Sequence, residues 1–391
     1  MTQEPLRFGV ASASDPLDPG PYSGMPAGLV AGFGTLGTPV VPIQAALPVS
    51  WQRRVQYLLA AARLRPAEVR RHGPRRAARI NQTRLLASPT LKLVRDTAAR
   101  TAMRGSPLAA VIQFGTEFAL PKGTRYATYD DMTVAQARRS YPYDWTTRLT
   151  PAELDYLERR QRRVFVRAHV CCVATHWAAT SLTEDYGIDP ARVRVVGVGA
   201  THATSPPPDR DWSVPRFLFI GKDWERKNGE AMLRAFADIR AEHPDASMDL
   251  VGGHPFIGQS GVRGHGVLAA GASKTRPLLE ELQRRATCFV MASRHEPAGI
   301  AYVEAASAGV GAIGSTSGGS ATLIGDGGLT VDPNDQEALV AAMRHFTDPD
   351  TARDFGANAA ARASLFTWPA VAERFLDALL DRPARPDRDA L

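Results

Sequence analysis

Two glutamates in the last third of the chain, Glu296 and Glu304, frame the segment Glu-Pro-Ala-Gly-Ile-Ala-Tyr-Val-Glu. Pro297 and Gly299 interrupt regular backbone directly after the first glutamate, whereas residues 300–308 contain no helix breaker. We therefore expect Glu296 on a loop and Glu304 in the first turns of a short helix, facing away from solvent. Ionised carboxylates only accept hydrogen bonds, so the pair suits a ligand rich in hydroxyl groups. The alternative is that both are ordinary exposed charged residues.

A basic loop lies about seventy residues upstream and contains Lys222, Arg226 and Lys227. The apolar run Phe217 to Ile220 predicts a strand before it, and Glu230 to Ile239 has the spacing of a helix after it. The chain has 5 lysines among its 47 basic residues, and two of them are in this loop. The use of lysine in a chain that otherwise uses arginine favours a compact ammonium acting as a point charge on phosphate. An ordinary basic loop is the alternative.

Two further turns have the character of anion sites. Gly318 and Gly319 separate a predicted strand at 312–314 from a predicted helix at 321–324, and paired glycines allow backbone N–H groups to approach a phosphate closely. Near the other end of the chain, Ser23 and Gly24 precede a helix predicted from about Met25 to Leu36. The free N–H groups at a helix start attract anions.

Together these motifs resemble those of the retaining nucleotide-sugar glycosyltransferases of glycosyltransferase family 4. The resemblance covers nearly the whole chain and rests on the Glu-x7-Glu element, the Gly221 to Lys227 loop, the Gly-Gly turn and the Ser-Gly loop. It implies the GT-B fold, an α/β architecture of two Rossmann-like domains facing each other across a cleft. The expected bounds are 1–205 for an N-terminal acceptor-binding domain, 213–365 for a C-terminal donor-binding domain, 366–382 for a helix returning to the first domain, and 383–391 for a flexible tail.

The resemblance also implies roles for the motif residues. Lys227 and Arg226 would hold the donor diphosphate, Glu304 the ribose hydroxyls and Glu296 the transferred sugar, with Gly24 on the β-phosphate. The other donor-binding candidates are Ser23, Lys222, Gly299, Ile300, Gly318 and Gly319. Three positions depart from the family pattern: Ala298 replaces a frequent aromatic residue, Lys222 a frequent arginine and Thr322 a frequent acid. The identity of the donor sugar therefore does not follow from the resemblance.

Candidates on the acceptor side follow three predicted strands of the first half, whose ends are where α/β sheets build sites. Asp130 and Asp131 follow the strand Tyr126 to Tyr129, and either carboxylate could contact an acceptor hydroxyl. His176 follows the strand Val170 to Ala174, where a capping or packing role is the alternative. Gly115 to Glu117 closes the strand Ala109 to Phe114. We include Asp130 and His176 among the catalytic candidates, beside Lys227, Arg226 and Glu296.

The segment from Arg53 to Arg104 has 14 basic residues and only two acids, whereas the net charge of the whole chain is +7. Anionic membranes, nucleic acid and a phosphate-bearing acceptor all attract such a patch. Only Trp51 and Tyr57 supply the aromatic residues expected at a nucleic-acid site, and both precede most of the basic residues, so we do not expect a nucleic-acid partner. The spacing of Val55, Leu58, Leu59 and Ala62 also permits a plain solvated helix.

Composition limits the remaining possibilities. A chain of 391 residues with 44% hydrophobic residues can form two full cores. No apolar run approaches 18 residues and the first residues lack a leader pattern, so we expect a cytoplasmic protein, with the inner membrane face as a further candidate location. Cys171, Cys172 and Cys288 lie in apolar runs, which favours buried reduced thiols over disulfides or a metal site. The predominance of arginine over lysine suggests a bacterium with a GC-rich genome.

The expected function is transfer of a hexose-type sugar from UDP or GDP to a small-molecule or a lipid or cell-envelope acceptor, with retention at the anomeric carbon. The cations Lys227 and Arg226 and the helix N-termini would neutralise the leaving diphosphate, so no metal or other cofactor is expected. The rival hypothesis is a sugar-nucleotide binding protein of the same fold that is non-catalytic or epimerase-like. Ala298 and Thr322 are the residues that favour this rival.

Overall fold

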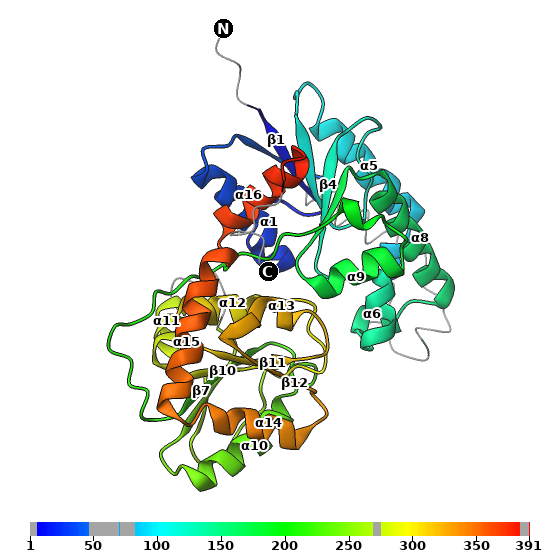
Figure 1. The fold of residues 1–391 in the computed structure, drawn as a ribbon. Coiled ribbons are helices and arrows are strands. Elements are labelled where there is room, and N and C mark those ends of the chain that lie inside the picture. Colours follow the sequence, from blue (N-terminus) through cyan, green and yellow to red (C-terminus); the bar gives the residue numbers. More distant parts are fainter. Residues whose placement is uncertain (1–5, 47–69, 71–82, 269–274, 384–390) are drawn as a thin grey trace. The chain divides into compact units, whose positions relative to one another are not determined.

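The computed structural model describes residues 6–46, 70, 83–268, 275–383 and 391. The chain forms two compact units (Figure 1). Unit 1 comprises Met1–Val173, Ala178–Arg194 and Ala372–Pro383, and unit 2 comprises Ala174–Trp177, Val195–Val371 and Ala384–Leu391. The predicted helix around Val55 to Ala62, and most of the basic segment that contains it, lie outside the described residues.

Unit 1 is built on a six-stranded sheet with the order β2-β1-β3-β4-β5-β6. The strands are β1 (Phe8–Ser12), β2 (Val40–Gln44), β3 (Ala110–Phe114), β4 (Tyr126–Asp130), β5 (Val170–Val173) and β6 (Val193–Val195). The pairs among β1 to β5 are parallel. Every residue of β1 and β3 is buried, which is typical of parallel strands covered on both faces.

The helices of unit 1 are α1 (Met25–Thr35), α5 (Pro89–Ala102), α6 (Val134–Ser140), α7 (Asp144–Thr147), α8 (Pro151–Arg167) and α9 (His176–Glu184), with short 3-10 turns at Pro21–Gly24, Leu85–Ala87 and Pro190–Arg192. Three of these helices, α5, α6 and α8, begin at residues whose side chains cap the first turn. Thr133 and Thr150 form capping boxes with Gln136 and Glu153 at the starts of α6 and α8. Ser88 caps α5. These caps satisfy N–H groups that a helix start leaves free.

Unit 2 contains a second six-stranded sheet, with the order β12-β11-β10-β7-β8-β9 and parallel pairing throughout. The strands are β7 (Arg216–Gly221), β8 (Ser247–Gly252), β9 (Val262–Gly264), β10 (Cys288–Val290), β11 (Ala312–Ser315) and β12 (Gly328–Val331). The helices are α10 (Gly229–Glu242), α11 (Arg276–Arg285), α12 (Ile300–Ser307), α13 (Ser320–Ile324), α14 (Gln336–His345), α15 (Pro349–Ala363) and α16 (Trp368–Leu379), with 3-10 turns at Gly325–Gly327 and Ser364–Phe366. In this unit the sheet lies between α10 and α14 on one face and α12 and α13 on the other (Figure 1).

The last helix, α16, begins in unit 2, and its residues from Ala372 onward belong to unit 1. Within unit 1 the ring of Phe375 makes an edge contact with Tyr129, with centroids 5.4 Å apart. The Nε of Arg125 donates to the carbonyl oxygen of Leu379 at 2.8 Å. The last helix thus returns to the first unit, as the resemblance implies.

The predicted strands and helices are present with ends that differ by one to three residues. The proline-rich stretch from Thr201 to Ser213 predicts a linker between the two domains, but unit 2 already begins at Val195. Thr204 is buried there: its N–H donates to Ser307 Oγ at 3.0 Å and its hydroxyl donates to Gln283 Oε1 at 2.9 Å. These hydrogen bonds to Ser307 and Gln283 make the start of the segment part of unit 2.

The three cysteines are buried with free thiols. Among the described helices, none is long and apolar enough to cross a bilayer.

Candidate functional site

The central strands of unit 2 are β7 and β10, which pair side by side although α10, β8, β9 and α11 separate them along the chain. The strands β8 and β9 continue the sheet on one side, and β11 and β12 continue it on the other. The strand order reverses between β7 and β10, and α/β sheets bind ligands beyond the carboxyl ends of strands at such a point. The loops that follow these two strands carry the basic motif and Glu296.

The loop after β7 is held in a fixed shape. Asn228, the N-cap of α10, has a left-handed backbone with φ 60°, and its Nδ2 donates to the carbonyls of Ala292 at 3.2 Å and Pro333 at 2.8 Å. Gly229 follows, where a Cβ would lie 2.3 Å from the ring of Trp224. The tight turn therefore requires glycine, and it places Lys227 in the interior beside the loop after β10.

Three donors converge on one oxygen of Glu296. Lys227 Nζ contacts Oε2, Ser293 Oγ donates to it at 3.2 Å, and Arg226 Nη1 approaches it at 3.4 Å. Arg226 Nη1 also donates to the carbonyl of His295 at 2.9 Å. No described residue donates to the other carboxylate oxygen, Oε1. This oxygen is therefore the one able to accept a hydrogen bond from a ligand hydroxyl.

The charges of this cluster depend on one another. Burial alone would raise the pKa of Glu296, but the neighbouring Lys227 and Arg226 outweigh it and the pKa lies below its ordinary value. Burial lowers the pKa of Lys227, and Glu296 opposes that shift. Burial also lowers the pKa of His295 to about 4, so this imidazole is neutral at physiological pH. Glu296 is an ionised acceptor in surroundings that favour negative charge.

Glu304 lies in α12 and is 7% exposed. The N–H of His202 donates to its Oε1 at 3.2 Å, and burial raises its pKa to about 7. Gly299 is the N-cap of α12, with φ 89°, and Ile300 is the first helical residue. The prediction that Glu296 lies on a loop and Glu304 faces inward from a short helix is confirmed.

The Gly-Gly turn packs directly against the loop that carries Glu296. The N–H of Glu296 donates to Ser317 O at 3.0 Å, and the N–H of Gly319 donates to Glu296 O at 2.8 Å. Gly318 has φ +119°, and a Cβ there would lie 2.0 Å from the carbonyl oxygen of Glu296. The structure thus gives these glycines a role in close backbone approach, while a contact with phosphate remains a prediction.

The other candidate residues lie elsewhere. Lys222 is exposed at the start of its loop and forms no hydrogen bond or ion pair with the described residues. His176 is exposed at the start of α9, where its backbone N–H donates to Thr322 Oγ1 at 3.1 Å. Asp130, Ser23 and Gly24 belong to unit 1.

In unit 1 the turn before α1 has an unusual backbone. Tyr22, Ser23 and Gly24 have φ angles of 52°, 55° and 80°, so two residues other than glycine adopt the left-handed conformation in succession. Such strain persists only where the surroundings impose it, and it marks functional positions more often than others. The surroundings hold Tyr22 in this conformation, because its hydroxyl donates a hydrogen bond to Glu117 Oε1 at 3.0 Å.

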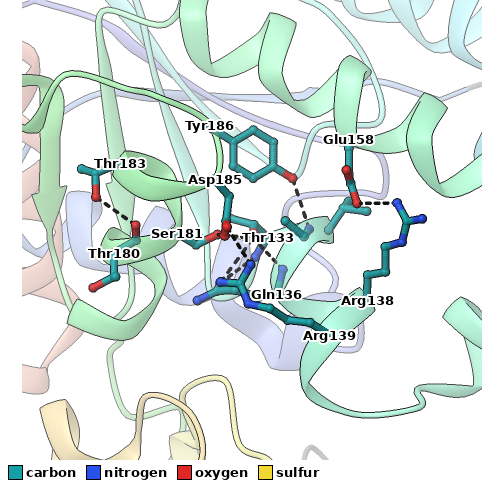
Figure 2. Close-up of polar contacts among 12 residues, drawn as sticks. Thr133, Gln136, Arg138, Arg139, Glu158, Thr180, Ser181, Thr183, Asp185 and Tyr186 are labelled. Carbon is teal, nitrogen blue, oxygen red and sulfur yellow. Dashed lines mark hydrogen bonds and ion pairs between the residues drawn. The ribbon is translucent and has the colours of Figure 1, made fainter.

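The loop that follows Asp130 is anchored by a buried hydroxyl relay (Figure 2). Thr133 Oγ1 and Ser181 Oγ are 2.6 Å apart, and Ser181 donates to Asp185 Oδ2. Because the Ser181 proton is directed to Asp185, Thr133 is the donor to Ser181. Asp185 is also paired with Arg139 at 2.7 Å. The relay joins the start of α6 to α9 and thereby fixes the segment between Asp130 and Thr133.

Sequence reasoning did not find Ser293, His295 or the roles of Asn228 and Tyr22. Asn228 could have been recognised, because asparagine before a helix is a typical N-cap and tolerates a left-handed backbone. Ser293 has no local signal beyond being three residues from Glu296.

Comparison with protein families shows that residues 214–348 match the model described as Glycosyl transferases group 1. The match lies wholly within unit 2. The matched residues include the whole Lys227–Glu296 cluster, Glu304 and the Gly-Gly turn. The match also agrees with the family resemblance of the sequence motifs.

Curated relatives have names of the same class. A D-inositol 3-phosphate glycosyltransferase of Nocardioides sp. (strain ATCC BAA-499 / JS614) is 30% identical over 253 residues, which cover 56% of this chain and 54% of the relative. An alpha-maltose-1-phosphate synthase of Mycolicibacterium smegmatis is 32% identical over 223 residues, which cover 49% of this chain and 57% of the relative. The chain thus spans about half the length of the curated relatives it matches.

Solved structures share the fold. A sucrose-phosphate synthase from Thermosynechococcus elongatus aligns with a TM-score of 0.66 and 16% identity, over 96% of this chain and 98% of the other. WaaG, a glycosyltransferase involved in lipopolysaccharide biosynthesis, aligns with a TM-score of 0.52 and 17% identity, over 74% and 82%. The two α/β units, the second of which contains the group 1 match, therefore have the architecture of GT-B glycosyltransferases.

Proposed function

We propose that this protein is a retaining glycosyltransferase that moves a hexose-type sugar from UDP or GDP to a small-molecule or lipid acceptor. The observation that carries the proposal is the buried Lys227–Glu296 pair with Arg226, at the carboxyl ends of β7 and β10 within a group 1 glycosyltransferase domain. Cations for a diphosphate and an acceptor for a sugar hydroxyl are placed together there.

The donor diphosphate would use the donors that Lys227 and Arg226 retain. An ammonium has three N–H donors and the contact with Glu296 occupies one, so the others are available to phosphate oxygens. Arg226 adds a planar guanidinium suited to phosphate. Glu296 Oε1 would accept a hydroxyl of the sugar, and Glu304 the ribose hydroxyls. Lys222, Gly24, Ser23, Gly299, Ile300 and the Gly-Gly turn remain proposed donor contacts.

The chemistry would rest on stabilising the leaving group. The bond between the anomeric carbon and the β-phosphate oxygen breaks, and the acceptor oxygen bonds to the same face of that carbon. The acceptor proton passes to the leaving phosphate oxygen, which yields the glycoside and a nucleoside diphosphate. Lys227 and Arg226 act where negative charge develops, the largest single contribution in many enzymes. This arrangement would work without a metal ion, and Asp130 and His176 remain candidate contacts for the acceptor.

The acceptor is the less defined half of the proposal. Several relatives are named for D-inositol 3-phosphate, which favours a small-molecule acceptor. Contact with an anionic membrane through the segment 53–104 is the lipid variant, and it predicts vesicle binding that weakens as salt rises. A cytoplasmic location is compatible with either variant.

The test compares Lys227→Ala with Lys222→Ala. Melting of the protein in the presence of UDP or GDP, followed by mass spectrometry for sugar transfer from each nucleotide sugar, establishes donor and activity. We expect Lys227→Ala to lower kcat/KM by about 10²–10³. Lys222→Ala, which removes an exposed proposed donor contact, should lower it less, and Lys122→Ala, at an exposed lysine of unit 1, should leave it unchanged. A melting curve confirms that each variant is folded.

Near-normal transfer by folded Lys227→Ala would exclude this mechanism. Nucleotide binding without transfer or donor hydrolysis would instead favour a non-catalytic sugar-nucleotide binding protein. Interconversion of the donor sugar without any acceptor would favour an epimerase-like enzyme.

A further inference from the structure

Asn228 is the point at which three loops of unit 2 meet. The residue directly follows Lys227 in the loop after β7, and it is 3% exposed. Its Nδ2 donates to the carbonyl of Ala292 in the loop after β10 at 3.2 Å, and to that of Pro333 in the loop after β12 at 2.8 Å. Because β12, β11, β10 and β7 are neighbouring parallel strands, these loops follow one edge of the sheet (Figure 1). One side chain links them, and we call its two hydrogen bonds the amide clamp.

The position of Asn228 demands two properties of its residue at once. Its backbone is left-handed, with φ 60° and ψ 36°, which glycine, asparagine and aspartate adopt more readily than other residues. Both partners of the side chain are carbonyl oxygens, which only accept, so the side chain must present two N–H donors. Glycine has no side chain, and aspartate would present oxygen atoms to the two carbonyls. Asparagine meets both demands, and because both of its N–H groups are engaged, neither is available to a ligand.

The amide clamp lies next to the groups that hold Glu296. Lys227, which precedes Asn228, contacts Glu296 Oε2, and Ser293, which follows Ala292, donates to the same oxygen at 3.2 Å. The first clamp bond therefore joins two residues that are each adjacent to a donor to Glu296. A shift of one loop against the other would change the direction of these contacts before it broke them, and hydrogen bonds weaken steeply as their angle departs from linear.

Other contacts keep the loop after β7 folded. Within the loop, the N–H of Gly229 donates to Trp224 O at 3.0 Å. The N–H of Arg294 donates to Arg226 O at 2.8 Å and joins the loop to its neighbour after β10. These backbone bonds do not involve the side chain of Asn228, so they remain when that side chain is removed. The expected consequence of its removal is a displaced ammonium group in a loop that is still folded.

We propose that Asn228 is a positioning residue of the transferase, one that acts through Lys227 and not on the substrate itself. The amide clamp holds the ammonium group of Lys227 where negative charge develops on the leaving diphosphate. This inference rests on the proposed function and adds to it the residue that sets the geometry of its main cation.

Positioning has a kinetic signature that differs from that of binding. Attraction between an ammonium and a diphosphate in the ground state varies gradually with distance, so a small displacement has little effect on the KM for the donor. Stabilisation of the transition state requires the N–H group at the atom on which charge develops, and a misplacement of about 1 Å can lower a rate by about 10². Loss of the clamp should therefore lower kcat and leave the KM for the donor nearly constant.

The first measurement compares the steady-state kinetics of sugar transfer by the wild type, Asn228→Gly and Asn334→Gly. Glycine keeps the left-handed backbone at position 228 and removes only the clamp, so we expect kcat to fall about 10- to 100-fold while the KM for the donor stays within about threefold. Asn334→Gly is the matched control in the same loop as Pro333. The Asn334 amide donates to Asp332 within that exposed loop, so both constants should stay at the wild-type values.

The second measurement does not depend on transfer. Urea denaturation of Lys227→Met, Glu296→Gln and the double variant gives the coupling between the two charged side chains. Because the clamp sets the distance and direction of this pair, the coupling in the Asn228→Gly background should fall to about half of its wild-type value or less. A merely structural role of Asn228 would lower the stability of every variant by the same amount and leave the coupling unchanged.

Either an unchanged kcat or an unchanged coupling in folded Asn228→Gly would overturn the inference, as would a loss confined to the KM for the donor. If Asn228→Gly does not fold, the same two measurements are made on Asn228→Asp, which keeps the size and the left-handed backbone but turns oxygen atoms toward the two carbonyls. No transfer by the wild type would count against the proposed function, and the coupling alone would then decide whether Asn228 positions Lys227.

Discussion

At the scale of single residues, the two oxygens of Glu296 have different tasks. Three donors fix Oε2, and Oε1 accepts from no described residue. A carboxylate held in this way presents a ligand with an acceptor whose direction is already set, which reduces the ordering cost of binding. Lys227 therefore has two effects, on the proposed diphosphate and on the geometry of Glu296.

The first prediction separates these effects through stability. Lys227→Met leaves Glu296 buried without its main cation, and we expect a loss of about 3–5 kcal/mol in the free energy of unfolding. The double variant Lys227→Met/Glu296→Gln removes both charges and should recover most of that loss. Urea denaturation of the wild type, both single variants and the double variant measures the coupling. Losses in the double variant equal to the sum of the single variants would contradict a tightly coupled pair.

The second prediction concerns Glu304, whose pKa of about 7 exceeds the ordinary 4.5 of a glutamate. Between these values the folded protein binds more protons than the unfolded chain, so the free energy of unfolding falls as pH rises from about 4.5 to 7. The total change is about 3 kcal/mol at this buried position. Glu304→Gln should lack this contribution, which denaturation at pH 5 and pH 8 would show.

A wild-type pH dependence that persists unchanged in Glu304→Gln would assign the effect to other groups. Nucleotide affinity provides an independent readout. If an ionised Glu304 accepts ribose hydroxyls, binding should strengthen from pH 6 to pH 8 in the wild type and not in the variant.

At the scale of elements, the loops at the site are joined by backbone contacts that only glycine allows. Gly318 has a left-handed φ, and its Cβ position coincides with the carbonyl of Glu296. The third prediction is that Gly318→Ala destabilises the protein by more than the roughly 1–2 kcal/mol of left-handed strain alone, because the two loops must also separate. Gly258→Ala is the control, since the nearest atom to its Cβ position is 3.8 Å away. Similar denaturation midpoints for both variants would refute this account.

The elements themselves could be predicted from the sequence. Apolar runs such as Phe8 to Ser12 bury every residue, and periodicity alone identifies them. The Lys227–Glu296 contact joins residues 69 positions apart and could not be predicted from spacing, because it depends on β7 pairing with β10. Motif resemblance grouped the two residues, but the contact between them follows from strand order.

The polar residues around Glu117 in unit 1 show the same limit more strongly. Glu117 and Asp130 were visible as residues at strand ends, whereas Tyr22 and Arg95 gave no signal of their own. Arg95 is one of many arginines in a basic segment, and only burial against the fold distinguishes it. Contacts among distant segments depend on tertiary packing, which local propensity does not encode.

At the scale of the whole molecule, the last helix, α16, joins unit 1 from Ala372 onward. The fourth prediction follows: Phe375→Ala, near the end of the chain, should cost about 3–5 kcal/mol, as for a core phenylalanine. Phe375 is fully buried against Tyr129. Val166→Ala on α8 is the control, because Val166 is 49% exposed and should change stability by less than about 0.5 kcal/mol. Equal denaturation curves for both variants would mean that α16 is not part of the unit 1 core.

Each sheet contains at least one buried cysteine, so the rate of thiol alkylation can measure how often each sheet opens. Cys171 and Cys172 lie on β5 of one sheet and Cys288 lies on β10 of the other, and burial raises the pKa of Cys171 to about 11. Alkylation requires an accessible thiolate, so each sheet should react only when it opens. Peptide mass spectrometry after timed exposure to iodoacetamide measures the alkylated fraction of each cysteine. It should therefore give the opening rate of each sheet from one sample. As UDP or GDP is added, alkylation of Cys288 should slow at a lower nucleotide concentration than alkylation of Cys171.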